Sequence, residues 1–320
     1  MTRTAPQITV LGEAIVDLTG TLDDRTFRAD PGGSPANVAV GLARLEIPVT
    51  LATGLGDDAF GRLLTEHLTG AGVHLATRTT EFTGLAVVTL EGAGIPAYDF
   101  ALSWKQDQTP LPPGTLALHT GSLAAALDPH HVEEAMAAAH PTATVTYDPN
   151  IRPALAADPA TERTRVQRQV ALSDVVKASE EDLASLYPDT DPLEVARRWR
   201  ATGPALVVIT HGPHGATALG AGEPVHLPSP KVTVADTVGA GDAFMAALLA
   251  GLWTADLLGA DRRTALAAAP TQTLAALLER AVSAAALTCT RPGADPPTAA
   301  ELNAATDTGP TQSADAYNAR

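Results

Sequence analysis

The 320-residue chain contains a single cysteine, Cys289, so it can form neither an intrachain disulfide nor a cysteine-clustered metal site. Its three lysines, Lys105, Lys177 and Lys231, stand outside any GxxxxGK[ST] frame, which excludes a Walker A phosphate loop. The HRD and DFG motifs of protein kinases are absent, and Gly12-Glu13-Ala14 follows the first strand pattern where a Rossmann dehydrogenase carries GxGxxG. Three common classes of nucleotide-binding protein are thereby excluded.

Positive charge is scarce as well. The chain has 21 Lys and Arg against 36 Asp and Glu, a formal net charge of −15. This balance argues against nucleic acid or an anionic membrane as a partner. No apolar run is long enough to span a bilayer, and the N-terminus leads into a strand pattern rather than a signal peptide, so we expect a cytoplasmic protein. Any phosphate must be held locally by backbone N–H groups and metal ions.

Strand and helix patterns alternate along the chain. Strand patterns cover residues 8–12, 49–53, 144–148 and 206–210, and helical patterns cover 36–45 and 60–71. This order predicts an α/β fold with a mainly parallel central sheet and helices on both faces. Residues 17–30 and 84–100 have strand patterns that interrupt this order, and we expect them to form strands that leave the main sheet and return. We expect one domain over residues 1–302 and a disordered tail over 303–320, because the tail lacks periodicity.

The segment Asp236-Thr-Val-Gly-Ala-Gly-Asp242 runs straight into an apolar helical pattern. Gly239, Ala240 and Gly241 allow the backbone to approach a ligand, and their N–H groups would point at it from a helix N-terminus, where negative charge is favoured. Asp242 is then placed to take a proton from a hydroxyl as phosphate arrives. The alternative interpretation is an ordinary strand-to-helix turn with an aspartate cap.

A second glycine-rich segment, Gly32-Gly33-Ser-Pro-Ala-Asn37, lies far upstream and continues through Gly61. Its glycines let backbone N–H groups approach hydroxyls, and Asn37 offers a donor and an acceptor at the head of a helix. Taken singly, it would be a helix-capping loop. Together the two segments resemble the C-terminal and N-terminal signatures of the ribokinase-like (PfkB) carbohydrate kinases, and the resemblance extends from Ile8 to about Pro297.

The resemblance implies an enzyme that transfers the γ-phosphoryl group of ATP to a sugar hydroxyl. Asp242 is then the general base, and the amides of residues 239–242 stabilise the transferring group. The segments 17–30 and 84–100 correspond to a β lid over the sugar, which in this family often forms a homodimer interface.

Two further segments complete the sugar site that the resemblance implies. Asp17, in Gly12-Glu-Ala-Ile-Val-Asp17, matches the opening motif of the family and would accept hydrogen bonds from two sugar hydroxyls. Arg152, in Asp148-Pro-Asn-Ile-Arg152, matches a segment of fructokinases and 2-keto-3-deoxygluconate kinases and would face the acceptor or the transferring phosphate. The alternative for Arg152 is a surface arginine after a proline-bounded turn.

The nucleotide site is implied by two segments. Lys177-Ala-Ser179-Glu-Glu-Asp182 resembles the Lys-x-Asn-x-x-Glu segment of the family, with Ser179 replacing Asn and Asp182 replacing Glu. The resemblance assigns Ser179 to the nucleotide and Asp182 to Mg²⁺ through water, whereas a charged helix start is the alternative. Thr210-His-Gly212-Pro-His-Gly215 fits the Thr-x-Gly-x-x-Gly nucleotide loop through its threonine and two glycines.

A monovalent cation is also implied. The segment 288–294, which contains Gly293, resembles the part of the family that encloses a cation together with Asp236 and the carbonyl of Val238. The expected cofactors are therefore ATP, Mg²⁺ and K⁺.

Fructose is the expected acceptor. Ser34 stands where kinases of sugar phosphates often carry a lysine, which favours an uncharged acceptor, and residues 118–123 and 148–152 are most like fructokinases. Residues 98–104, however, lack the arginine common to fructokinases and ketodeoxygluconate kinases. The alternatives are 2-keto-3-deoxygluconate or another sugar or nucleoside, and, from another class, a non-catalytic sugar or nucleotide sensor on the same fold, against which the presence of Asp242 argues.

Overall fold

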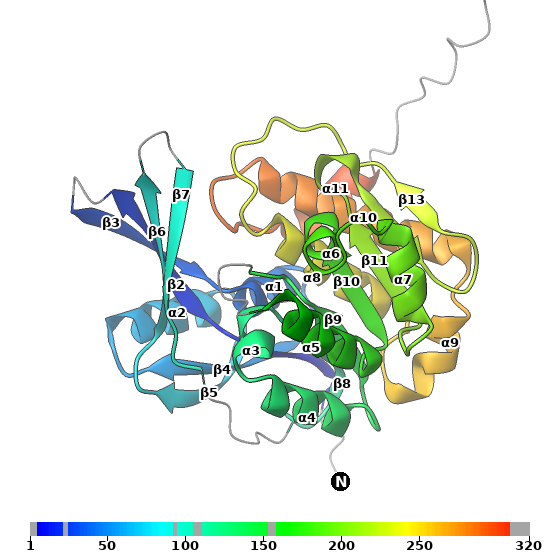
Figure 1. The fold of residues 1–320 in the computed structure, drawn as a ribbon, viewed down its shortest axis with the longest axis horizontal. Helices are drawn as coiled ribbons and strands as arrows, with labels where there is room; N and C mark the ends of the chain where they lie inside the picture. Colours follow the sequence, from blue (N-terminus) through cyan, green and yellow to red (C-terminus); the bar gives the residue numbers. More distant parts are fainter. Residues whose placement is uncertain (1–4, 22–24, 92–94, 105–110, 153–157, 308–320) are drawn as a thin grey trace, which may run out of the picture.

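The structure is a computed structural model that describes residues 5–21, 25–91, 95–104, 111–152 and 158–307. It is built around a central β-sheet (Figure 1). Nine described strands lie in the order β13-β12-β11-β10-β9-β8-β1-β4-β5. The strands from β11 to β5 are parallel to one another, and β12 pairs antiparallel with both of its neighbours, β11 and β13. Their bounds are β1 Gln7–Leu11, β4 Val49–Gly56, β5 His74–Thr80, β8 Thr115–Gly121, β9 Thr144–Asp148, β10 Val175–Ser179, β11 Leu206–Thr210, β12 Ala216–Leu219 and β13 Val225–Leu227.

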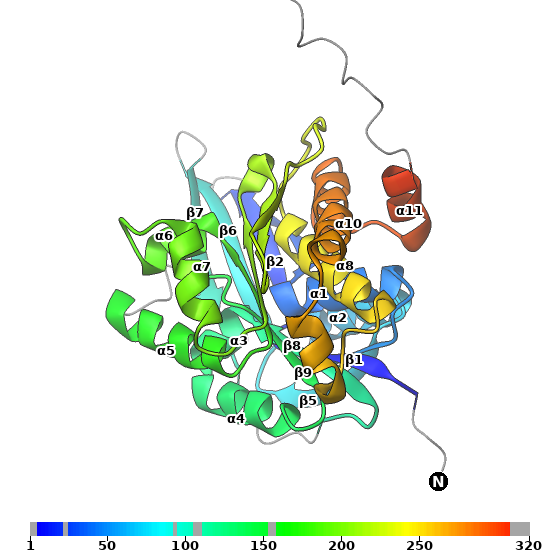
Figure 2. The ribbon, with the colours of Figure 1, turned by 90° about the vertical axis from the view of Figure 1, so that its right-hand side faces the viewer.

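Helices cover both faces of this sheet, as Figure 2 shows. One face carries α1 Ser34–Arg44, α2 Ala59–Gly70, α8 Ala240–Thr254, α9 Arg263–Ala267, α10 Thr271–Cys289 and α11 Ala299–Asp307. The other carries α3 Ser122–Leu127, α4 Pro129–Ala139, α5 Pro159–Ala171, α6 Glu180–Leu186 and α7 Pro192–Arg200. Because both faces are buried, β11 is apolar from Leu206 to Ile209: Val208 packs in one core, and its neighbours Val207 and Ile209 pack in the other.

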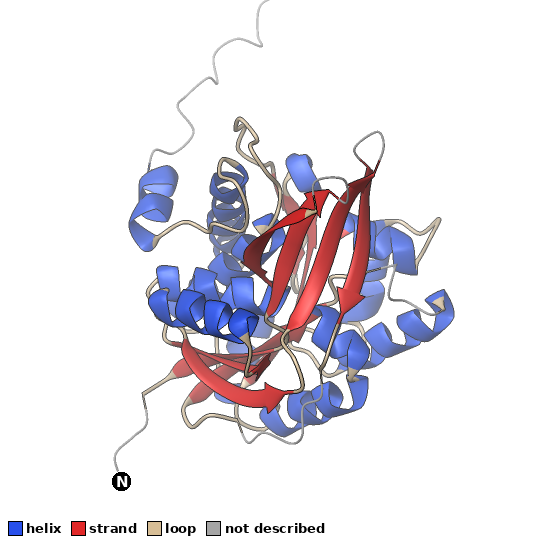
Figure 3. Cartoon of the chain, turned by 90° about the vertical axis from the view of Figure 1, so that its left-hand side faces the viewer, coloured by secondary structure: helices blue, strands red, loops and turns tan. Residues whose placement is uncertain are grey.

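A smaller sheet stands apart from the main body (Figures 1 and 3). It comprises β2 Ile15–Thr21, β3 Thr26–Gly32, β6 Gly84–Glu91 and β7 Ile95–Ala101, in the order β3-β2-β6-β7. The chain enters it directly from the carboxyl end of β1, so this sheet, called the lid here, begins at the edge where parallel sheets bind ligands. The α/β fold and the strands predicted to leave the main sheet are confirmed.

The C-terminal boundary was predicted too early. Residues 303–307 belong to α11 rather than to a disordered tail, because Leu302 is fully buried and holds this helix against α10. The rest of the predicted tail, residues 308–320, lies outside the described residues. Within the described part of the chain, none of the helices has the length and apolar character needed to cross a bilayer.

Candidate active site

Helix α8 begins at a glycine turn whose geometry suits an anion. Gly239 caps the helix in the left-handed conformation, with φ at 75°, and a Cβ atom there would lie 2.6 Å from the Cβ of Ala294. Both the backbone angle and the space therefore require glycine. The amides of the first turn have no partner within the helix and lie at its positive end. The assignment of Gly239, Ala240 and Gly241 to phosphate stays a prediction.

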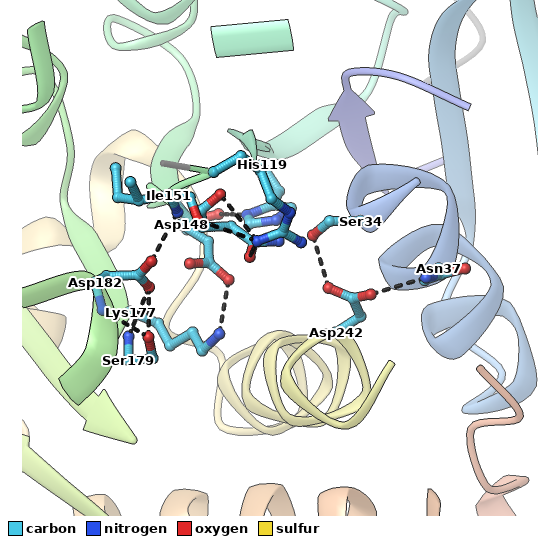
Figure 4. Close-up of polar contacts among 12 residues, drawn as sticks. Ser34, Asn37, His119, Asp148, Ile151, Lys177, Ser179, Asp182 and Asp242 are labelled. Carbon is cyan, nitrogen blue, oxygen red and sulfur yellow. Dashed lines mark hydrogen bonds and ion pairs between the residues drawn. The ribbon is translucent and has the colours of Figure 1, made fainter. Parts of the chain in front are cut away.

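Asp242, in the first turn of α8, is held by two side chains from the N-terminal part of the chain. The Ser34 hydroxyl donates a hydrogen bond to its Oδ1 over 2.6 Å, and the Asn37 amide donates to its Oδ2 over 2.8 Å (Figure 4). Both donors come from the start of α1, so the two glycine-rich segments meet at one carboxylate. Each carboxylate oxygen keeps a second lone pair, and Asn37 keeps its own side-chain oxygen as an acceptor. The carboxylate is thus oriented and still able to accept a proton.

Asp17 lies on the lid strand β2 against Gly32 of β3. A Cβ atom on Gly32 would lie 2.3 Å from Oδ2 of Asp17, so the glycine makes room for this carboxylate. Burial and the negative charges of Asp30 and Asp242 raise the pKa of Asp17 to about 6, against the opposing charge of Arg152. The structure therefore places Asp17 against Gly32 and within electrostatic reach of Arg152 and Asp242.

Arg152 is exposed, and its guanidinium donates to Oδ1 of Asn150 over 2.6 Å. This bond holds the guanidinium against the turn that follows β9, within electrostatic reach of Asp17. The structure supports neither sugar nor phosphate as its specific partner, and its binding role stays a prediction.

Gly33 and Glu13 form the back wall of this site. Gly33 has a φ of 98°, and a Cβ atom there would lie 2.7 Å from the carbonyl oxygen of Glu13. The Glu13 carboxylate is buried and accepts a hydrogen bond from the amide of Ala124 over 2.9 Å, which ties the turn after β1 to α3. Burial raises the pKa of Glu13 to about 7. No local sequence pattern predicts this contact between Glu13 and Ala124.

The predicted nucleotide residues follow neighbouring strands. Ser179 and Thr210 end β10 and β11 and are paired in register. Gly212 and Gly215 follow in a short turn with φ values of 52° and 100°, which glycine adopts readily. The Ser179 hydroxyl accepts a hydrogen bond from the Asp182 backbone amide over 3.0 Å, which caps α6, and donates to Oδ2 of Asp182 over 2.8 Å. The charged helix start considered as an alternative is thus present, and the nucleotide role of Ser179 stays a prediction.

Asp182 suits an indirect metal role. Its Oδ1 accepts a hydrogen bond from the Ile151 amide over 2.7 Å, and its Oδ2 is occupied by Ser179. A carboxylate has about four lone-pair sites, so Asp182 retains capacity for a water molecule. Within the described ranges, no group of three His, Cys, Asp or Glu side chains is arranged to hold a metal ion. This donor set fits Mg²⁺ bound chiefly by phosphate oxygens and water.

The three predicted cation residues lie together. Oδ1 of Asp236 accepts hydrogen bonds from the amides of Thr237 and Val238, at 2.7 and 3.1 Å, and Oδ2 accepts from the Gly293 amide at 2.8 Å. Partial burial pushes the pKa of Asp236 up, but these hydrogen bonds outweigh it and hold the pKa below its usual range. Asp236 therefore stays charged and joins the turn before α8 to the segment after α10.

Two polar residues of the site were not assigned from the sequence. Ser34 was noted only as a position without lysine, yet it orients Asp242. Lys177 was quoted only as part of a segment, yet its ammonium forms a buried ion pair with Asp148, with 2.7 Å between Nζ and Oδ2. Contacts between residues so far apart in sequence leave no local pattern by which they could be found.

Comparison with known proteins gives one consistent result. The sequence model of the family described as pfkB family carbohydrate kinase matches residues 5–301. A fructokinase from Klebsiella pneumoniae is 36% identical over 261 residues, which cover 77% of this chain and 84% of that protein.

Solved structures agree. A fructokinase from Xylella fastidiosa with bound ATP superposes with a TM-score of 0.80 and 26% identity, covering 94% of this chain and 98% of the other. A fructokinase from Vibrio cholerae O395, in a form with bound fructose, ADP and calcium ion, gives a TM-score of 0.76 and 29% identity, covering 93% and 98%.

Proposed function

The chain belongs to the pfkB family of carbohydrate kinases, and from this premise we infer that it transfers the γ-phosphoryl group of ATP to a hydroxyl of fructose. The observation that carries the proposal is the position of Asp242. It lies beside the N-terminus of α8, is oriented by Ser34 and Asn37, and is within electrostatic reach of Asp17 in the lid. A proton acceptor thus lies between a site for phosphate and a site for hydroxyl groups.

The acceptor site is built for hydroxyl groups. The Asp17 carboxylate and the side-chain oxygen of Asn37 are acceptors, and the backbone at Gly32 and Gly33 is open to close approach. Ser34, a neutral residue, occupies the position nearest to Asp242. The names of the similar fructokinases support fructose as the acceptor.

The reaction is an in-line transfer. As the acceptor oxygen bonds to the γ-phosphorus, the bond from the γ-phosphorus to the bridging oxygen breaks and ADP leaves, while the hydroxyl proton passes to Asp242, whose orientation Ser34 and Asn37 fix. The amides of residues 239–242 stabilise the negative charge on the transferring group without having to reorganise during the reaction. The Thr210 to Gly215 turn lies at the same sheet edge and receives the nucleotide.

Two metal ions assist in this proposal. Mg²⁺ would neutralise the phosphate charge, with Asp182 acting on it through water. K⁺ would be held by Asp236, the carbonyl of Val238 and the segment at Gly293, next to the first turn of α8.

We further propose a cytoplasmic homodimer that pairs through the lid, where Phe27 of β3 is 39% exposed. Light scattering of the wild type and of Phe27→Ser tests the dimer.

The test of the proposed function is a coupled ADP-release assay with fructose, with and without Mg²⁺ and K⁺. Asp242→Asn keeps the shape of the side chain but accepts no proton, and the loss of a general base lowers the rate by about a hundredfold to ten-thousandfold. We expect kcat to fall on this scale while ATP binding by calorimetry survives. Near-normal turnover in Asp242→Asn refutes the assigned base, and a wild type that binds fructose and ATP without releasing ADP is a sensor rather than a kinase.

A further inference from the structure

Lys177, in the middle of β10, and Asp148, the last residue of β9, form a buried pair. Lys177 is 4% exposed and Asp148 is 1% exposed, and the ammonium nitrogen lies 2.7 Å from Oδ2 of Asp148. Burying two charges is unfavourable unless their interaction repays the loss of hydration, so a pair at this depth calls for an explanation. The mechanism above uses neither residue.

The ammonium group lies directly against the start of α8. A Cβ atom on Gly241 would lie 3.2 Å from Nζ of Lys177, so the lysine occupies the space that a side chain at this position would need. Figure 4 shows Lys177 extending toward the helix that carries Asp242. Burial pushes the pKa of Lys177 down, but the charge of Asp148 outweighs it, with contributions from Asp182 and Asp242, and the pKa rises above its usual range. The lysine is therefore charged.

The hydrogen bonding of this cation is incomplete. An ammonium group has three N–H donors, and within the described residues the structure gives Lys177 one acceptor, Oδ2 of Asp148. The other oxygen of Asp148 is buried and has no hydrogen-bond partner in the same part of the chain. Both members of the pair thus keep hydrogen-bonding capacity that the described residues do not use. Its positive member lies next to the backbone of Gly241, where the charge of a transferring phosphoryl group would collect.

We propose that Lys177 is a positioning residue for phosphoryl transfer: held by Asp148 beneath Gly241, it supplies fixed positive charge under the amides at the start of α8. This rests on the proposed kinase function. A helix N-terminus contributes only partial charge, equivalent to roughly half an elementary charge. A full cation in a site shielded from water strengthens the field at the same place, and it needs no reorganisation when the transition state forms.

The competing explanation is that Lys177 only neutralises Asp148. Removing the lysine alone does not separate the two, because it leaves a buried carboxylate unpaired, which is strongly destabilising in itself. The informative comparison is therefore between Asp148→Asn and the double variant Asp148→Asn/Lys177→Met. These two proteins differ only in the lysine, and neither buries an unpaired carboxylate at position 148.

The experiment measures kcat, the KM values for fructose and ATP, and the melting temperature of both variants and of the wild type. We expect the double variant to be folded, with a fructose KM close to that of Asp148→Asn, and to have a kcat lower by about ten- to a hundredfold, somewhat less than the loss of one oxyanion-hole donor. A kcat within threefold of that of Asp148→Asn overturns the proposal and leaves Lys177 a structural counter-charge.

A second measurement decides the matter should the double variant not fold. In the Asp148→Asn background, Lys177→Arg keeps the charge and Lys177→Gln removes it, and neither protein buries an unpaired carboxylate at position 148. Aluminium fluoride bound with ADP mimics the transferring group. At saturating Mg²⁺, we expect the variant with arginine to bind ADP with aluminium fluoride more tightly than ADP alone. In the variant with glutamine, we expect this ratio of affinities to be at least tenfold smaller. Equal ratios in the two variants contradict the proposal. Wild-type turnover of fructose, measured in parallel, tests the kinase function separately.

Discussion

Glu13 provides a quantitative test of the packing behind the acceptor site. Its carboxyl group is 3% exposed, and burial raises its pKa from 4.5 to about 7 in the folded protein. The folded state therefore binds a proton at pH values where the unfolded state does not. The contribution of Glu13 to stability is present below about pH 4.5 and is lost as pH rises through about 7.

The size of this effect follows from the two pKa values. Linkage between them gives a loss of about 2–3 kcal/mol in the free energy of unfolding on going from pH 5 to pH 8. Glu13→Gln cannot ionise, yet its side-chain oxygen can still accept the hydrogen bond from the Ala124 amide. We expect this variant to lose less stability between the two pH values than the wild type does, and the difference in loss to be of that size.

The assay is urea unfolding followed by circular dichroism at pH 5 and pH 8. Other groups titrate over this range, so the comparison is between the pH dependence of each variant and that of the wild type. Glu223→Gln, at an exposed position, is the matched control and should follow the wild type. If Glu13→Gln shows the same pH dependence as the wild type, Glu13 is not buried as described and the contact between the turn after β1 and α3 is wrong.

Three further outcomes follow from the site. Burial raises the pKa of Asp17 to about 6, so the wild-type fructose KM should rise as pH falls through that value. Asp17→Asn loses a charged hydrogen bond, so its fructose KM should be about ten- to a hundredfold higher and nearly independent of pH. If the KM of this variant follows the same pH profile as that of the wild type, the role of Asp17 is contradicted. Gly239→Ala forces alanine into the left-handed region, at about 1–2 kcal/mol, and against Ala294, so thermal melting should occur at lower temperature and the ATP KM should rise; unchanged values would show that the turn is not as described. Asp236→Asn should abolish activation of the ADP-release rate by K⁺, and persistent activation places the cation elsewhere.

The sequence predicted what short segments encode. The strand and helix order and the glycine turn at Gly239 follow from local periodicity and backbone freedom, and the resemblance placed Asp242 and Asp17 in one site. The contact of Ser34 with Asp242 and the position of Lys177 beneath Gly241 depend on how distant elements pack, and no local pattern carries that information.

The end of the fold shows the same limit. Residues 303–307, Asn-Ala-Ala-Thr-Asp, lack hydrophobic periodicity, which predicts disorder. Tertiary contacts hold their helix in place: Leu302 is buried, and Arg280 of α10 donates a hydrogen bond to Asn303 over 3.1 Å.

The most direct test of the account is a side-by-side measurement of kcat/KM for fructose, ribose, adenosine, 2-keto-3-deoxygluconate and fructose 6-phosphate in the presence of ATP, Mg²⁺ and K⁺. Neutral Ser34 beside Asp242, and Asp17 against Gly32 as the proposed contact for the hydroxyl groups, lead us to expect the highest value for fructose. The kcat/KM for fructose 6-phosphate should be low, because position 34 is serine rather than the lysine that kinases of sugar phosphates often carry there. A ranking led by 2-keto-3-deoxygluconate or by adenosine would contradict fructose as the acceptor and would identify Arg152 or the lid as the source of a different specificity.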